Sequence, residues 1–178
     1  MQKPTFNQKN PCVCAAGSRL RADHAEREDR ILDGDLLITE KVTLKGRIVK
    51  GNVTIAASAA GTAIRDCTVE GDITVLADDV QVMFCTVLGT VMLGAAVNQI
   101  VALCVAKDIV LDGAKNSVVL KNRAEDITAK NGHAVYVIEN VTDNLTLTDN
   151  NYLIADCNAA ENTVANALLS PTPCRSRL

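Results

Sequence analysis

A theme of five residues recurs eight times along this chain and constrains its fold more than any other feature. The copies are GDLLI (34–38), GNVTI (51–55), GDITV (71–75), GTVML (89–93), KDIVL (107–111), EDITA (125–129), DNLTL (143–147) and ENTVA (161–165). Successive copies begin 17, 20, 18, 18, 18, 18 and 18 residues apart. Repeats of such constant length are typical of solenoid proteins, in which each copy is one structural unit stacked on the next.

Within each copy apolar and other residues alternate, which is the period of a half-buried β-strand. We expect the fourth position of each copy to face outward. These outward residues, here called the first outward row, are Thr54, Thr74, Met92, Val110, Thr128 and Thr146. The residues on either side of them are expected to face inward: Leu36/Ile38, Val53/Ile55, Ile73/Val75, Val91/Leu93, Ile109/Leu111, Ile127/Ala129 and Leu145/Leu147.

A second theme lies between these copies, in AIRDC (63–67), QVMFC (81–85), IVALC (100–104), VVLKN (118–122), YVIEN (136–140) and IADCN (154–158). Its last position forms the turn row: Cys67, Cys85, Cys104, Asn122, Asn140 and Asn158. Asparagine tolerates left-handed backbone angles, and its amide can bond to an identical residue one coil away. We interpret the cysteines of this row as small apolar fillers of a buried turn.

A repeat of about 18 residues is too short for helical hairpins, which need about 30 or more. The pattern therefore predicts an all-β fold, a single-stranded right-handed parallel β-helix of about eight coils. A left-handed β-helix of hexapeptides is the alternative. Steps of six residues from Ile73 reach Asp79 and, after the one extra residue before Cys104, Asn116 and Asn122. That fold expects apolar residues at these positions, so the right-handed form is favoured.

The ends of the chain differ in composition from the repeats. Residues 1–17 are expected to be flexible, and residues 18–32 are expected to form an α-helical cap over the first coil. Ser18 is a suitable N-cap residue, and Asp23 and Arg27 are spaced to form an i,i+4 pair. The predicted β-helix covers residues 33–166, and residues 167–178 are expected to form an irregular tail.

The GDITV, EDITA and DNLTL strands, with an asparagine at the turn, resemble the right-handed parallel β-helix of the pectin lyase-like superfamily over about residues 33–165. The segment LKGRIVKGNVTI (44–55) is also similar to bactofilins, which are bacterial β-helix filament proteins. The first resemblance implies a polysaccharide lyase, a glycoside hydrolase or a fragment of one. The second implies a filament subunit.

Acidic residues recur at one turn of the predicted coil. Asp72, Asp108 and Asp126 share one position of the repeat, and carboxylates stacked about 5 Å apart could bind calcium, a hard cation that takes oxygen ligands. Pectate lyases, which this fold resembles, depend on calcium. The alternative is a solvated row of turn-forming residues, in which Asn52, Asn144 and Asn162 occupy the same position. No other cofactor is expected.

No catalytic residues can be assigned from the sequence. Asp78–Asp79 and Asn131–Gly132–His133 are similar to fragments of polygalacturonase motifs, but the repeat places them three coils apart. Aromatic residues make up only 2% of the chain, as Phe6, Phe84, Tyr136 and Tyr152. So few rings cannot line a long sugar-binding groove, which disfavours a polysaccharide as the partner.

Charge and hydropathy exclude further classes of partner. With a net charge of −3, the chain lacks the basic surface that neutralises nucleic-acid phosphates. No apolar stretch is long enough to predict a membrane span, and the N-terminus lacks the apolar core of a signal peptide, so the cytoplasm is the default location. We expect a non-catalytic structural or binding module that self-associates into homo-oligomers through the first outward row or through the ends of the solenoid. A carbohydrate-active enzyme and a bactofilin-like filament subunit are the alternatives.

Overall fold

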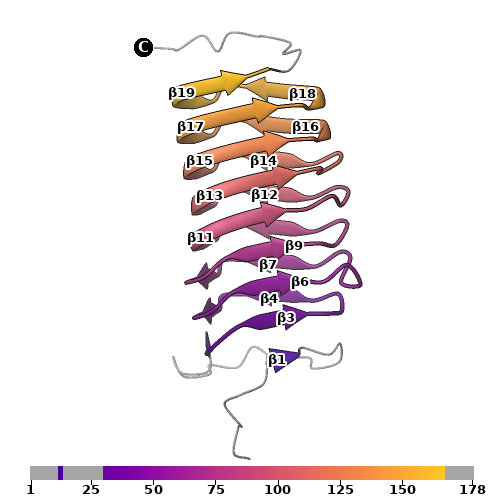
Figure 1. Cartoon of the computed structure of the whole chain (residues 1–178). Coiled ribbons are helices and arrows are strands. Elements are labelled where there is room, and N and C mark those ends of the chain that lie inside the picture. Colours follow the sequence, from indigo (N-terminus) through magenta and orange to yellow (C-terminus); the bar gives the residue numbers. More distant parts are fainter. Residues whose placement is uncertain (1–11, 14–29, 167–178) are drawn as a thin grey trace, which may run out of the picture.

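The computed structural model describes residues 12–13 and 30–166, which wind into a parallel β-solenoid of about eight turns (Figure 1). The predicted all-β parallel solenoid is therefore confirmed. Residues 1–11, 14–29 and 167–178 lie outside the described residues, and with them most of the predicted helical cap and the C-terminal tail. Ile31 and Leu32, which the prediction placed at the end of that cap, instead form strand β2.

The larger sheet has twelve strands, and the five-residue theme lies at its centre. Its main series is β1 (Cys12–Val13), β3 (Leu36–Ile38), β6 (Val53–Ile55), β9 (Ile73–Val75), β11 (Thr86–Leu93), β13 (Val105–Asp112), β15 (Arg123–Lys130), β17 (Val141–Thr148) and β19 (Ala159–Ala165). A short side series, β2 (Ile31–Leu32), β5 (Ile48–Val49) and β8 (Thr68–Val69), joins it at β11.

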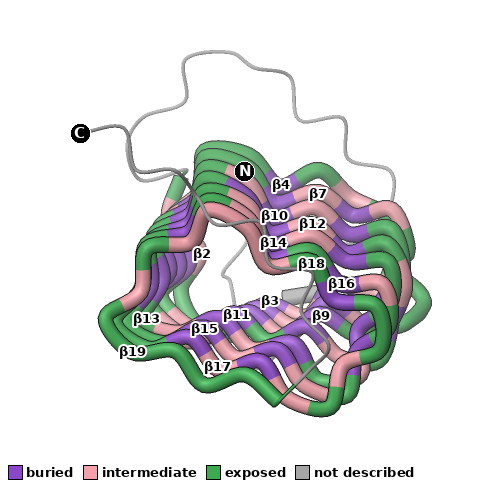
Figure 2. Tube along the Cα trace, turned by 90° about the horizontal axis from the view of Figure 1, so that it is seen from above, coloured by how far each residue is buried: buried purple, intermediate pink, exposed green. Residues whose placement is uncertain are grey.

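The second theme builds a sheet of seven strands on the opposite side of the solenoid (Figures 1 and 2). It consists of β4 (Thr43–Lys45), β7 (Ala63–Arg65), β10 (Gln81–Met83), β12 (Ile100–Ala102), β14 (Val118–Leu120), β16 (His133–Ile138) and β18 (Asn151–Asp156). Both sheets are parallel, and each strand pairs with its equivalent in the next coil.

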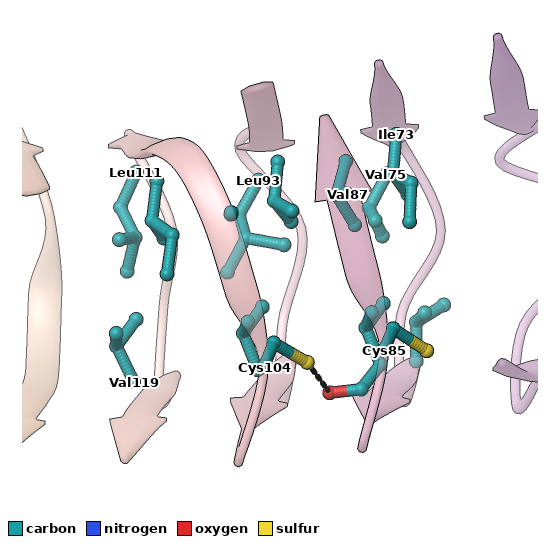
Figure 3. Packing of buried hydrophobic residues seen from close by; sticks show 14 of the residues in the cluster. Ile73, Val75, Cys85, Val87, Leu93, Cys104, Leu111 and Val119 are labelled. Atoms are coloured by element: carbon teal, nitrogen blue, oxygen red, sulfur yellow. Dashed lines mark hydrogen bonds between the residues drawn. The ribbon is translucent and has the colours of Figure 1, made fainter. Parts of the chain in front are cut away.

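The core fills the space between the two sheets. All fourteen residues predicted to face inward from the five-residue theme, from Leu36 to Leu147, are buried. They pack against inward residues of the second sheet such as Val101 and Val119, and Figure 3 shows Leu93 and Leu111 on one side of the interior with Cys85 and Cys104 on the other. Because β-branched residues and leucine fill each level, the solenoid needs no aromatic side chain in its core.

The larger sheet has two short strands per coil at its N-terminal end and one long strand per coil from β11 onward. Gly51, Gly71 and Gly89 stack closely, and a Cβ built on Gly71 would lie 2.8 Å from the Gly51 carbonyl oxygen. Around Gly51 and Gly71 the side-series strand and the main strand are separate elements, whereas Gly89 lies inside the continuous strand β11. Lys107 and Glu125 follow in the same row, and they too lie inside continuous strands of eight residues, β13 and β15.

Candidate functional site

The turn row follows the seven-stranded sheet at a fixed backbone geometry. The residue before each member has a positive φ, as in Phe84 (56°), Leu103 (56°) and Lys121 (54°). The expectation that the asparagines themselves adopt the left-handed conformation is therefore wrong. The asparagines do not need it, because the preceding residue makes the bend and directs the Asn122 and Asn140 side chains into the solenoid, where both are buried.

The asparagines form a ladder, as predicted. The Cys104 N–H donates to Asn122 Oδ1 at 2.9 Å, and the Asn122 N–H donates to Asn140 Oδ1 at 2.9 Å. The Asn122 Nδ2 also donates to the Val101 carbonyl at 3.0 Å and to Asn140 Oδ1 at 3.0 Å. Asn140 repeats this pattern with Val119 and Asn158. Each amide thus gives a hydrogen-bond partner to a backbone N–H and a backbone carbonyl at the turn of the preceding coil.

The cysteines of the turn row occupy the place of the amide, and they are donors as well as fillers. The Cys104 Sγ lies 3.5 Å from the Val82 carbonyl oxygen of the preceding coil, as Asn122 Nδ2 lies beside Val101 (Figure 3). Hydrogen bonding to Cys104, together with burial, raises the pKa of Cys85 to about 11. Hydrogen bonding to Cys85 and burial raise the pKa of Cys67 further, which keeps these thiols protonated and unreactive near neutral pH.

The predicted calcium ligands lie in one row but do not surround a common point. Thr90 separates Asp72 from Asp108, while Asp108 and Asp126 are neighbours. Asp72 Oδ1 accepts the Thr90 N–H at 2.7 Å, and Asp126 Oδ1 accepts Asn144 Nδ2 at 2.6 Å. Within residues 12–13 and 30–166, no three His, Cys, Asp or Glu side chains are grouped to hold a metal ion. The row is thus a hydrogen-bonded ladder on the solvated edge, and calcium binding there stays a prediction.

The polygalacturonase-like fragments are engaged in separate structural contacts. Asp78 Oδ1 accepts the Val97 N–H at 2.8 Å. Val97 forms a parallel β-bridge with Lys115 in the next coil, and Lys115 forms another with His133 in the coil after that. The His133 ring contacts the Tyr152 ring edge-on, with 5.3 Å between the ring centroids. The fragments are therefore three coils apart, as the repeat predicts. Asp78–Asp79 and His133 could not both contact the same bond of a substrate.

The first outward row is continuous from coil to coil. Thr54 pairs with Thr74, Met92 with Val110, and Thr128 with Thr146. Met92 is the most exposed of the six. The row that contains Asp72, Asp108 and Asp126 flanks the first outward row on one side. The row is thus one side chain wide, and its role as an interaction face stays a prediction.

The outward side of the seven-stranded sheet, here called the second-sheet face, is broader and more apolar. Two parallel rows of side chains cover it. One contains Thr43, Ala63, Gln81, Ile100, Val118, Tyr136 and Ile154, and the other contains Lys45, Arg65, Met83, Ala102, Leu120, Ile138 and Asp156. The exposed Phe84 and Leu103 adjoin the second row at the turn.

Our sequence interpretation missed this face, although a signal exists. The segments VMF, IVAL and VVL of the second theme do not alternate with polar residues. A strand that is apolar at successive positions is apolar on both sides. In Figure 2 these strands carry intermediate residues (pink) between the buried ones (purple), so the outer side chains remain partly accessible.

An open depression of about 260 Å³ lies on the coils of β13, β15 and β17, over Val105, Arg123, Glu125 and Asp143. Within the described ranges there is no helix of the length and apolar character that a membrane span requires. Comparison of the chain with protein-family models, with curated proteins and with solved structures finds no match.

Proposed function

We propose that this chain is a non-catalytic structural or binding module whose working surface is the second-sheet face. The observation that carries the proposal is the run of apolar side chains in both rows from β12 to β16: Ile100, Ala102, Val118, Leu120, Tyr136 and Ile138. Contiguous apolar patches of this kind on a folded surface mark interaction sites. We further propose that the solenoid winds in the right-handed sense of the pectin lyase-like superfamily, which the asparagine turn row supports.

Two measurements test this function. Hydrophobic-interaction chromatography should retain the wild-type chain more strongly than Leu120→Asp, while Thr128→Asp, on the other sheet, should shift retention much less. Incubation with polygalacturonate or alginate should release no unsaturated or reducing sugars. Retention that Leu120→Asp leaves unchanged, or sugar release that Asp108→Ala or Asp126→Ala abolishes, would overturn the proposal.

A filament subunit is the second candidate, favoured by the ends of the solenoid. In the described part of the chain, β18 and β19 pair with a neighbour on one side only, and so does β4. Unpaired strand edges are templates for adding another chain. Filaments that sediment and that form independently of the second-sheet face would favour this candidate.

A further inference from the structure

We propose that the second-sheet face binds a second copy of this chain, with the two solenoids packed face to face and antiparallel. This inference rests on the function proposed above and names the partner. The evidence for it is the order of side chains along the second row, which runs from basic through apolar to acidic: Lys45, Arg65, Met83, Ala102, Leu120, Ile138, Asp156.

This order is complementary to its own reverse. A two-fold axis that runs along the strands at the level of β12 would place each row opposite itself with the coils in reverse order. Lys45 then faces Asp156 of the second copy, and Met83 faces Leu120 of the second copy. Arg65 faces Ile138 of the second copy, and its guanidinium donates to Gln81 within its own chain. Ala102 lies on the axis opposite its own equivalent, where its small side chain, only 3% exposed, allows the two sheets to approach. Such pairing of a patch with itself is the hallmark of an isologous dimer.

The charges select this orientation over the parallel one. A parallel pairing would bring Lys45 and Arg65 of both copies together at one end, and like charges at an interface are unfavourable. The residues directly before the turn row adjoin this face, and in the antiparallel pairing their one like-charged juxtaposition is Asp66 opposite Glu139. Each of these is already paired within its own chain, Asp66 with Lys45 at 3.7 Å and Glu139 with Lys121 at 3.2 Å.

The small size of the face indicates a reversible dimer. Seven strands about 4.8 Å apart, with about five residues of strand and turn across, give a flat area of about 500 Å². Stable complexes bury about 800 Å² of accessible surface per partner, so this face is at the lower end of the range. We therefore expect a reversible dimer with a dissociation constant of about 1–100 µM.

Sedimentation velocity of the full chain between about 1 and 200 µM tests the dimer. We expect a monomer–dimer equilibrium, with the dissociation constant raised at least tenfold in Leu120→Asp and unchanged in the control Thr128→Asp. Lys45→Glu and Asp156→Lys should each weaken the dimer. The double variant should associate more tightly than either single variant, because opposite charges again face each other across the interface, although Asp66 loses its lysine partner. Circular dichroism of every variant should match that of the wild type.

Three results would overturn the second copy as the partner. They are a monomer at all concentrations, association that Leu120→Asp leaves intact, and a double variant no better than the two single ones. A monomer that is still retained on the hydrophobic column would leave the binding module standing and exclude only this partner. Loss of that retention difference would instead remove the proposed function itself.

Discussion

Asn122 illustrates how single side chains hold the turns of this molecule. Its amide contacts two neighbouring coils. It accepts the Cys104 N–H and donates to the Val101 carbonyl of the preceding coil, and it donates to Asn140 Oδ1 of the next coil. All these groups are buried or nearly so, and a buried polar group without a partner costs about 1–3 kcal/mol. The turn row therefore stabilises the solenoid mainly by preventing that cost.

Asn122→Ala should lower the free energy of unfolding by about 2–4 kcal/mol, because the Cys104 N–H and the Val101 carbonyl both lose their hydrogen-bond partner. Asn122→Cys is the matched control, since cysteine retains a donor at this position, as Cys104 does toward Val82. It should lose less than the alanine variant in urea denaturation. Equal losses in the two variants would contradict a hydrogen-bonding role for the row.

Gln99 presents the opposite case. It is fully buried, and its Oε1 has no hydrogen-bond partner within the described residues, while its Nε2 reaches the Val75 carbonyl at 3.4 Å. Replacing an unsatisfied polar group by an apolar one of similar shape removes a desolvation cost. Gln99→Met should therefore raise the free energy of unfolding by about 1 kcal/mol, and a loss of similar size would argue that Oε1 is solvated inside the solenoid.

The thiols of the turn row predict how stability changes at alkaline pH. The pKa of Cys85 is raised to about 11 and that of Cys67 further, so the folded state keeps protons that the unfolded chain releases above about pH 8.5. Stability should therefore fall as the pH rises from about 8.5 toward 11, partly offset because accepting a hydrogen bond from Cys85 lowers the pKa of Cys104.

Chemical denaturation of the wild type and of Cys67→Ala/Cys85→Ala between about pH 7 and 10.5 measures this contribution. Lysines and tyrosines titrate in both proteins, so the difference between the two curves isolates the thiols. The wild type should lose more stability than the variant over this interval. Parallel curves would contradict the raised pKa values.

At the scale of strands, the period-two pattern of the five-residue theme was sufficient to predict which residues of the larger sheet face inward. The second-sheet face could not be found in this way, because Ile100, Val101 and Ala102 are apolar on both sides of the strand. The left-handed backbone positions directly before the turn row were equally hidden. They fall on residues such as Phe84 and Leu103, which have no intrinsic preference for that conformation and adopt it because the stacked turns require it. Thus local preference identified the strands, and tertiary stacking fixed the turns.

Strand β13 offers a direct test of inward and outward positions. Ile109 is fully buried between Val91 and Ile127, whereas Val110 faces outward in the first outward row. Ile109→Asp should cost more than about 4 kcal/mol and unfold the middle coils, since it buries an unpaired charge. Val110→Asp, one residue away, should change stability by less than about 1 kcal/mol. Similar melting temperatures for the two variants would contradict the register.

Over the whole molecule, the core thins toward the C-terminal end. Leu145 and Leu147 are buried in β17, while Thr163 and Ala165, which pair with them in β19, are exposed. In a solenoid each coil contacts only its neighbours, so stability is a sum of local contributions. The last coil therefore has less apolar burial to hold it than the middle coils have.

Hydrogen exchange followed by mass spectrometry should record this gradient. Peptides from β18 and β19 should exchange at least tenfold faster than peptides from β13 and β15, because the terminal coil opens without unfolding the rest. Uniform protection along the solenoid would instead indicate a single cooperative unit. Leu147→Ala should widen the difference, since it weakens the level directly beneath β19.

The parallel stacking of the coils also has a mechanical consequence. The hydrogen bonds between coils run along the long axis, so tension applied along that axis loads them one level at a time, and coils should peel from an end in sequence. A coil of about 18 residues occupies about 4.8 Å of the stack but reaches about 60 Å when extended. Under tension the molecule would act as a reserve of length, released in nearly equal steps of about 60 Å.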